Sequence, residues 1–153
     1  MEILHMDIFH IDKTYILTIL DKFSRFARGQ ILEARNSINI ADKLLQFFAN
    51  RGILNKIITD NAKEFTSSLI KEILDKYNIV HHVTSQKNST GNSPVERLHS
   101  SLIEIYRIIS QRDKQKTKSE KIAETMITHN NYIQQLHPHG KYNENRIKYK
   151  NIT

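Results

Sequence analysis

Residues 56–83 constrain the fold most, because two short apolar runs flank an amphipathic segment there. The runs KIIT (56–59) and IVHHV (79–83) have the length and composition of strands. Between them, SSLIKEILDKY (67–77) has an apolar face at helical spacing, formed by Leu69, Ile70, Ile73 and Leu74. Strands that alternate with a helix form a parallel pair in one sheet. This segment therefore predicts two parallel strands with a helix packed on them.

The segments before residue 56 predict a small antiparallel unit followed by a helix. Three runs rich in Ile, Leu, Phe and Thr, separated by polar turns, are typical of strands: ILHMDIF (3–9), TYILTILD (14–21) and ARGQILEA (27–34). Apolar residues at helical spacing then predict a helix over 39–50, which Gly52 ends.

Two further helices are expected after residue 83. Ser93, Pro94 and Glu96 form a helix start, and one apolar stripe follows it, made of Val95, Leu98, Leu102, Ile105 and Ile109. A second capping-box pattern, Thr117 with Glu120, predicts a last helix that ends by His137-Pro138. The polar stretch 84–93 between strand and helix is expected to be a mobile loop.

This order of elements predicts an α/β fold. We expect a five-stranded mixed sheet, three antiparallel strands and then two parallel ones, flanked by helices in the ribonuclease H-like arrangement. A chain of 153 residues is the size of one domain. We expect that domain to span residues 1–136 and to be followed by a polar, basic tail over 137–153.

Composition narrows the function. Lys and Arg total 23 against 16 Asp and Glu, a net charge of +7, and this favours a polyanionic partner such as nucleic acid. The absence of cysteine excludes disulfides and thiolate zinc sites, and the scattered histidines predict no metal site of their own. No stretch approaches the ~20 apolar residues of a membrane span, so a soluble, intracellular protein is expected.

Three acidic residues are candidates for chemistry. In the expected sheet, Asp7 on the first strand lies beside Asp60 at the end of the fourth, so two carboxylates meet on neighbouring strands. Each also has a structural interpretation: Asp7 as a satisfied polar residue, Asp60 as a turn residue. Glu96 has one too, because it is the third residue of a helix begun by Ser93, where a capping box explains it without metal.

Each of these acids lies in a short sequence motif, and the motifs follow in the order HMDIF, TDNAKEF and GNSPVERLHSSL. There are 35 residues between Asp60 and Glu96. At these residues the chain resembles the integrase catalytic cores of retroviruses and LTR retrotransposons, with Asp7, Asp60 and Glu96 matching their D,D-35-E triad. The phrase DKFSRF (21–26) resembles the gypsy class in particular. Two departures are Ala62, where the family has Gly, and the lack of the family's zinc-binding and C-terminal DNA-binding domains. The latter predicts a core domain, a fragment or a truncated reading frame.

The resemblance implies a two-metal polynucleotidyl transferase and endonuclease, which processes 3′ ends of retroelement DNA and joins them to target DNA. Asp7, Asp60 and Glu96 would be catalytic and would bind two Mg²⁺ or Mn²⁺ ions, since hard cations prefer carboxylate oxygens. Double-stranded DNA is the expected partner, a homodimer or higher oligomer the expected state, and the nucleus the expected location. The expected DNA-binding residues are Asn61, Lys87, Ser100, Arg107 and Lys114.

The prediction that Ser100, Arg107 and Lys114 bind DNA rests on helical geometry. Arg107 and Lys114 fall within about 20° of Glu96 around a continuous helix, and Ser100 lies on the same flank. A solvated basic flank is the alternative interpretation. At the level of the whole chain, two alternatives stay open: an inactive or domesticated integrase fragment that binds DNA or dimerises, and a ribonuclease H-like nuclease or transposase outside the integrase family.

Overall fold

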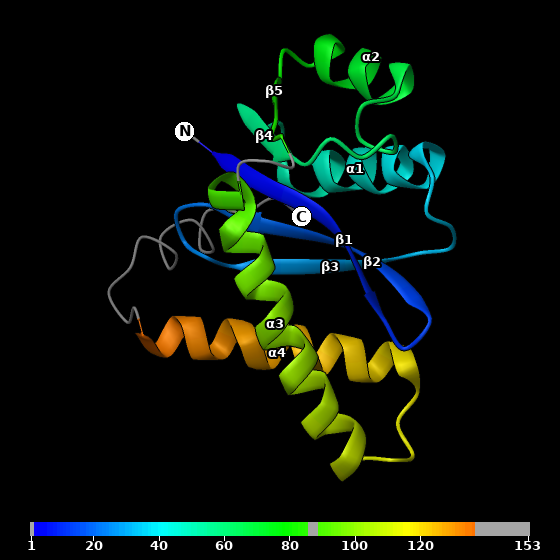
Figure 1. Cartoon of the computed structure of the whole chain (residues 1–153), viewed down its shortest axis with the longest axis vertical. Coiled ribbons are helices and arrows are strands. Elements are labelled where there is room, and N and C mark those ends of the chain that lie inside the picture. Colours follow the sequence, from blue (N-terminus) through cyan, green and yellow to red (C-terminus); the bar gives the residue numbers. More distant parts are fainter. Residues whose placement is uncertain (1, 86–88, 137–153) are drawn as a thin grey trace.

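A computed structural model of the chain describes residues 2–85 and 89–136, with the backbone alone for residues 89–93. Five strands and four helices follow one another in these ranges (Figure 1). The strands are β1 (Ile3–Ile11), β2 (Thr14–Asp21), β3 (Ala27–Leu32), β4 (Lys56–Thr59) and β5 (Val80–Val83). The helices are α1 (Ser37–Arg51), α2 (Ser68–Lys76), α3 (Ser89–Arg112) and α4 (Lys118–Leu136). In the described part of the chain, no helix is long and apolar enough to cross a membrane.

The five strands form one mixed sheet in the order β3-β2-β1-β4-β5, which confirms the expected ribonuclease H-like architecture. β1, β2 and β3 pair antiparallel, whereas β1 with β4 and β4 with β5 pair parallel. β1 is therefore central, and β4 joins it through the crossover that contains α1. The β1–β4 pairing covers only Ile3 to His5, with His5 opposite Ile58.

Side chains alternate across the sheet, so both of its faces are covered. On one face, Leu4, Met6 and Leu17 pack with residues of α1 and α2. On the other face, Phe9 and Ile16 pack with the buried side chains of α3 and α4. Figure 1 shows α3 crossing this second face, with α4 beside it. The two separate cores explain why β1 and β2 carry near-continuous apolar runs.

Local signals set the ends of α1 and α2. The Asn36 side chain accepts a hydrogen bond from the Asn39 backbone N–H at 2.9 Å and caps the start of α1. Gly52 ends this helix as expected, at φ 88° and with its N–H donating to the Phe48 carbonyl. The side chain of Ser67 caps α2 in the same way.

Three sequence expectations were wrong in detail. α3 begins at Ser89, so Ser93 lies inside the helix and is not its N-cap. Pro94 is thus an internal proline, which cannot donate to the carbonyl one turn earlier. The α3 stripe buries Tyr106, while Ile105 is only half-buried, because drift of the 3.6-residue period moves the contact by one position. α3 also ends at Arg112, before Lys114.

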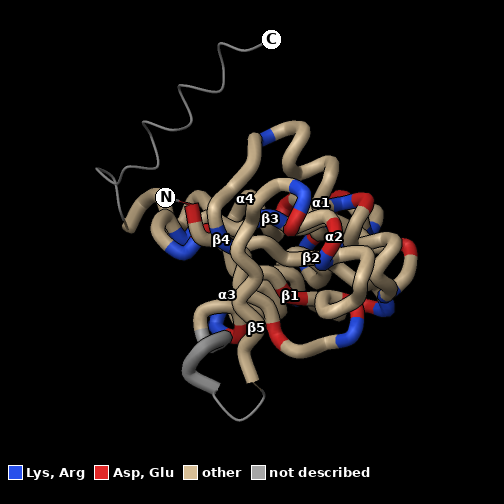
Figure 2. The backbone as a smooth tube through the Cα atoms, turned by 90° about the horizontal axis from the view of Figure 1, so that it is seen from above, with Lys and Arg blue, Asp and Glu red and all other residues tan. Residues whose placement is uncertain are grey.

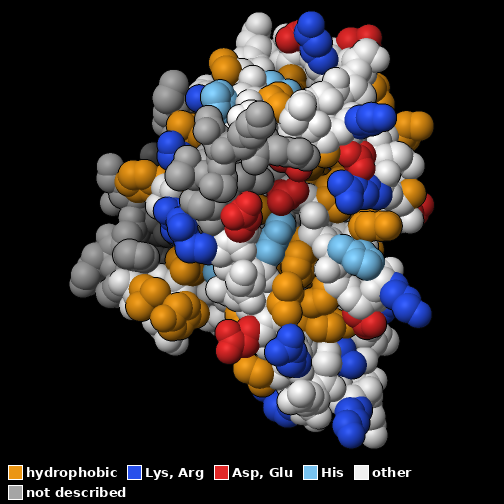
Figure 3. Space-filling model, in the orientation of Figure 1, with side chains coloured by type: hydrophobic (Ala, Val, Ile, Leu, Met, Phe, Trp, Pro, Cys, Tyr) orange, Lys and Arg blue, Asp and Glu red, His pale blue; other side chains and the backbone are white. Residues whose placement is uncertain are grey.

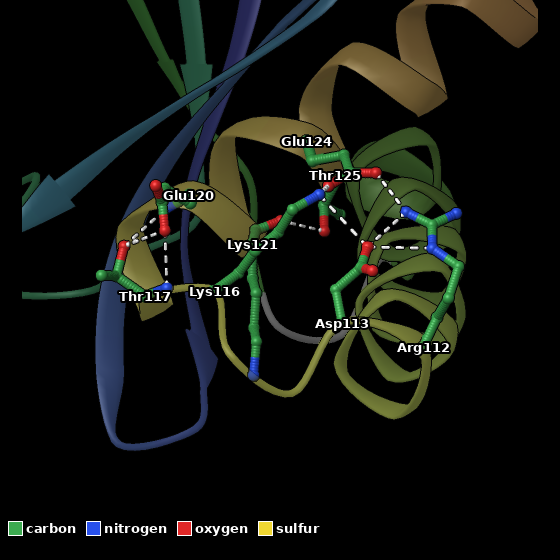
Figure 4. Close-up of polar contacts among 8 residues, drawn as sticks. All are labelled: Arg112, Asp113, Lys116, Thr117, Glu120, Lys121, Glu124 and Thr125. Atoms are coloured by element: carbon green, nitrogen blue, oxygen red, sulfur yellow. Dashed lines mark hydrogen bonds and ion pairs between the residues drawn. The ribbon is translucent and has the colours of Figure 1, made fainter.

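The connection from α3 to α4 is held by charged side chains (Figure 4). Arg112 and Lys116 each contact Asp113 and also Glu124 on α4, so two cations and two carboxylates form one network. Beside it, the expected capping box is confirmed: the Glu120 side chain accepts from the Thr117 N–H at 2.7 Å, and the Glu120 N–H donates to the Thr117 hydroxyl at 3.2 Å. This network fixes the turn between the two helices.

Candidate active site

Asp7 lies in the middle of β1, on the sheet face that α3 covers. Its side chain is 20% exposed, and one carboxylate oxygen accepts a hydrogen bond from the Ile8 backbone N–H at 2.7 Å. On β2 the residue opposite Asp7 is Thr18. On the other side, Asp7 lies two residues beyond the last paired position of β1 with β4. On the β4 side, the strand is therefore unpaired at this carboxylate.

Asp60 follows the last residue of β4 directly. Continuing the register of His5 with Ile58 places Asp60 at the level of Asp7. The Asp60 side chain accepts a hydrogen bond from the Ala62 N–H at 3.1 Å and so folds the chain into a tight turn. Ala62 packs against the core and is not among the described residues with positive φ, so this turn does not need the glycine usual in the resembled family.

Glu96 is exposed on α3, well inside the helix. The capping-box interpretation of Glu96 was wrong, because that role belongs to the third residue of a helix and α3 begins at Ser89. The helix instead carries Glu96 to the sheet face where Asp7 lies, since the next turn of α3 contacts β1 through His99.

The three carboxylates act on one another electrostatically. Burial raises the pKa of Asp7 to about 6, the hydrogen bond from Ile8 opposes this shift, and the negative charges of Asp60 and Glu96 add to it. Figure 3 shows acidic side chains gathered beside a histidine on this face. Two further negative charges near a half-buried carboxylate are a costly arrangement, which a bound cation would relieve.

A nearby arginine is one feature that sequence reasoning missed. Arg35, between β3 and α1, also influences Asp7, and its positive charge lowers the pKa of that carboxyl. The Arg35 Nε donates to Glu64 at 2.5 Å, across 29 residues of sequence. Only the tertiary fold brings these two side chains together, so no local sequence signal could have identified the pair.

His99 is the second feature that sequence reasoning missed. Its ring stacks on Phe9 at 4.7 Å, its Nε2 lies 2.8 Å from the Thr18 hydroxyl, and its Nδ1 lies 3.8 Å from an Asp7 carboxylate oxygen. Burial lowers the pKa of His99 to about 4, so the ring is neutral at pH 7 and this last contact is not an ion pair. Its position three residues after Glu96, on the same side of a helix, was the one available signal.

The donor set fits a hard divalent cation, because it consists of carboxylate oxygens rather than thiolates. Within the described residues, however, no three His, Asp or Glu side chains are arranged closely enough to hold a metal ion. Asp7, Asp60 and Glu96 are thus in electrostatic contact without forming a closed coordination shell. Their catalytic and metal-binding roles stay predictions.

The residues expected to bind DNA do not form one stripe. Asn61 is exposed beside Asp60, and Arg107 is exposed on α3. The Ser100 hydroxyl donates to the Glu96 carbonyl of its own helix at 3.1 Å. Lys114 was wrongly placed on the helix flank, because α3 ends at Arg112, and Lys87 lies outside the described residues. Figure 2 shows Lys and Arg spread over several elements.

The sequence is similar to proteins of mobile elements and retroviruses. The family model "Integrase core domain" matches residues 1–89. The Pol polyprotein from transposon gypsy of Drosophila melanogaster is 31% identical over 133 residues, covering 86% of this chain and 13% of that protein. The Pol polyprotein from transposon opus of the same species is 31% identical over 108 residues, covering 71% of this chain and 11% of that protein. The chain therefore spans only a small part of the polyproteins that it matches.

Solved structures share the fold. The catalytic core domain of BIV integrase superposes with a TM-score of 0.71 at 19% identity, covering 82% of this chain and 81% of that one. The HTLV-2 integrase catalytic core domain in complex with magnesium, in a trimeric form, gives 0.69 at 19% identity and 82% of each chain. A chain of the simian T-cell lymphotropic virus intasome in complex with PP2A regulatory subunit B56 gamma gives 0.75 at 20% identity, covering 82% of this chain and 47% of that one.

The family model covers more than half of the sequence, and two relatives reach 31% identity over most of it. The fold agrees with these matches independently of sequence, because the superposed cores are below 25% identical. The chain therefore belongs to the integrase core domain family.

Proposed function

We propose that this chain is a Mg²⁺-dependent polynucleotidyl transferase and endonuclease, which processes the 3′ ends of retroelement DNA and transfers them into target DNA. The observation that carries the proposal is the electrostatic contact of Asp60 and Glu96 with the half-buried Asp7. The catalytic core of HTLV-2 integrase, which has this fold, is in complex with magnesium. Two of the similar proteins are Drosophila polyproteins from transposons, which supports retroelement DNA as the substrate.

Each of the three carboxylates has a distinct place in this proposal. Asp7 on the central strand, Asp60 after β4 and Glu96 on α3 would together hold the ions. When bound, two divalent ions neutralise charge on the scissile phosphate and activate the attacking oxygen. The protein contributes position: Asp7 lies on the central strand, a hydrogen bond from the Ala62 N–H holds the Asp60 turn, and α3 brings Glu96 to them from the covering layer. Double-stranded DNA would lie on the exposed side of this site.

Activity on DNA tests the proposal. The purified chain is incubated with Mg²⁺ or Mn²⁺ and either supercoiled plasmid or branched oligonucleotides that mimic the joined product of element end and target. We expect nicked plasmid and resolved oligonucleotide products that EDTA abolishes. Absence of products with either ion, from a chain shown to be folded, would contradict an enzymatic role for this chain alone.

A second candidate is an inactive integrase-like module that binds DNA or a second copy of the chain. The observation that favours it is the absence, within the described residues, of three acidic or histidine side chains arranged to hold an ion. DNA binding without any metal-dependent product would be its signature. The intasome and the trimeric core among the structural neighbours support an oligomeric state for either candidate.

DNA binding should depend on salt and only weakly on sequence, because a chain of net charge +7 acts mainly on phosphates. We expect Arg107→Glu to weaken binding and to reduce the slope of log affinity against log salt by about 1. Lys114→Glu is the matched comparison: it makes the same charge change beyond the end of α3 and should have the smaller effect. Fluorescence anisotropy at several salt concentrations measures the DNA affinity of both variants. If both variants titrate like the parent chain, Arg107 lies on a solvated flank and does not contact DNA.

A further inference from the structure

Each of the two aspartates has a threonine and a histidine beside it, with Thr18 on the neighbouring strand β2 and Thr59 directly before Asp60 in the chain. The Thr18 hydroxyl donates to the Asp7 carbonyl at 3.0 Å and lies 2.8 Å from His99 Nε2. The Thr59 hydroxyl donates to the Asp60 carbonyl at 2.8 Å and lies 2.8 Å from His81 Nε2. Both threonines are fully buried, at 0% and 1% exposure, so water cannot replace these partners.

The single proton of a threonine hydroxyl fixes the direction of each chain of hydrogen bonds. If Thr18 donates its proton to the Asp7 carbonyl, it can only accept from His99, and the neutral His99 ring then carries its proton on Nε2. Nδ1 of the ring is then unprotonated and faces the Asp7 carboxylate, at a distance too long for a hydrogen bond. The same count gives His81 a proton on Nε2.

We propose that His99 and His81 are positioning residues of the active site, which hold the main chain at Asp7 and Asp60 through Thr18 and Thr59. This inference rests on the proposed function, since it assigns the two aspartates to metal binding. Each histidine comes from an element other than that of its aspartate: His99 from α3 and His81 from β5. The two chains of bonds thus tie the helix that carries Glu96, and the sheet edge, to the two aspartates.

Burial supports a neutral ring at both positions, in which the proton on Nε2 is the only ring N–H proton. It lowers the pKa of His99 and, together with the charge of His82, that of His81. Stacking on Phe9 fixes the ring plane of His99 and so directs Nε2 at Thr18. In this tautomer Nδ1 presents a lone pair 3.8 Å from the Asp7 carboxylate, which suits a cation or a donor group between them.

The tautomers can be measured on the unmodified chain. Long-range ¹⁵N–¹H correlation NMR distinguishes a protonated from an unprotonated ring nitrogen. We expect His99 and His81 to be neutral at pH 7 with the proton on Nε2. A proton on Nδ1 of His99 would mean that Thr18 donates to the ring instead of to the Asp7 carbonyl, and this would overturn the inference at Asp7.

Metal affinity tests the positioning role. Mn²⁺ titration followed by EPR should show an affinity loss of about 10–100-fold for Thr18→Val and His99→Phe, the usual effect of removing a partner behind a metal ligand. His99→Gln, which keeps a donor N–H, should recover part of the loss. The matched control is His10→Phe, because His10 is an exposed residue of β1 whose ring lies tilted against Tyr15, outside the site.

The outcomes separate the two proposals. If the parent chain binds Mn²⁺ and both Thr18→Val and His99→Phe bind it equally well, the positioning role fails while the proposed function stands. If the parent chain binds no Mn²⁺, the proposed function fails and the positioning role with it. Should His99→Phe not fold, the tautomer of the parent chain and the affinity of Thr18→Val still decide.

Discussion

Asp7→Asn should abolish DNA cleavage and strand transfer and, in metal-free buffer at pH 7.5, raise the melting temperature of the chain. Activity is lost because an amide lacks the charge that a hard cation binds. Stability is gained because the parent must hold an ionised carboxylate whose pKa is raised from 3.8 to about 6 by burial and by neighbouring acids. A shift of this size corresponds to roughly 3 kcal/mol. For a chain of this length that is ~6–12 °C.

The sign of this effect follows from proton binding. Between pH 3.8 and about 6, the folded chain holds a proton on Asp7 that the unfolded chain has released, so this residue favours folding at low pH and loses that contribution as pH rises. The difference in melting temperature between Asp7→Asn and the parent should therefore close near pH 4. His99 acts in the opposite direction in this window, because its pKa is lowered to about 4.

Scanning calorimetry with EDTA at pH 7.5 and pH 4 measures the difference. Asp75→Asn is the matched control, since Asp75 is exposed on α2, and it should leave both stability and activity unchanged. Excess Mg²⁺ should stabilise the parent chain and leave Asp7→Asn unaffected, because only the parent binds the ion. An Asp7→Asn variant that cuts DNA as well as the parent would show that the site has been assigned wrongly.

The sequence was sufficient for the fold where local signals and burial agree. β2 and β4 have the expected bounds, because each is a short apolar run between clear turns. The start of α3 was missed because Ser93-Pro94 is a strong local start signal, whereas the helix begins at Ser89. The end of α3 was missed for a related reason, because Asp113 and Lys114 continue a helical pattern. In the structure Asp113 bonds to Arg112 and Lys116, and Lys116 bonds to Glu124, so these residues form the turn to α4.

The sequence predicted only part of the site. The order of elements suggested the ribonuclease H-like arrangement, in which the fourth strand pairs with the first, and this placed Asp7 beside Asp60. Thr18 and His99 could not be found in this way, because their meeting depends on the register of β1 with β2 and on how α3 lies across the sheet. The assignment of residues 1–136 as one domain with a tail over 137–153 stays a prediction, and the tail lies outside the described residues.

The charges and the burial around Asp7 make this site costly to maintain without a metal ion. Asp7 is half-buried among like charges, and Nδ1 of His99 lies 3.8 Å from its carboxylate, too far for a hydrogen bond. A chain selected only for stability would not keep this arrangement, because functional sites commonly trade stability for activity. This cost distinguishes Asp7 from Glu96, which is exposed and pays no comparable penalty.

Glu96→Gln should therefore behave differently from Asp7→Asn: activity should fall at least ~100-fold, while the melting temperature in metal-free buffer should stay within about 2 °C of the parent. Gln and Glu have similar helix propensities, and substitution of an exposed residue usually changes stability by no more than about 0.5 kcal/mol. Loss of the charge, however, removes one of three carboxylates from the proposed metal site. The measurement is strand transfer and nicking with Mg²⁺, next to thermal unfolding with EDTA.

Glu104→Gln is the control for this substitution, because Glu104 is another exposed glutamate of α3 and the charge change is the same. It should retain the activity of the parent, so that any loss in Glu96→Gln belongs to the position of Glu96 and not to the net charge of the helix. With Ser93 inside α3, a capping role no longer competes for Glu96. Full activity of Glu96→Gln, in an assay that the parent passes, would remove Glu96 from the site and leave Asp7 and Asp60 as its only proposed acidic ligands.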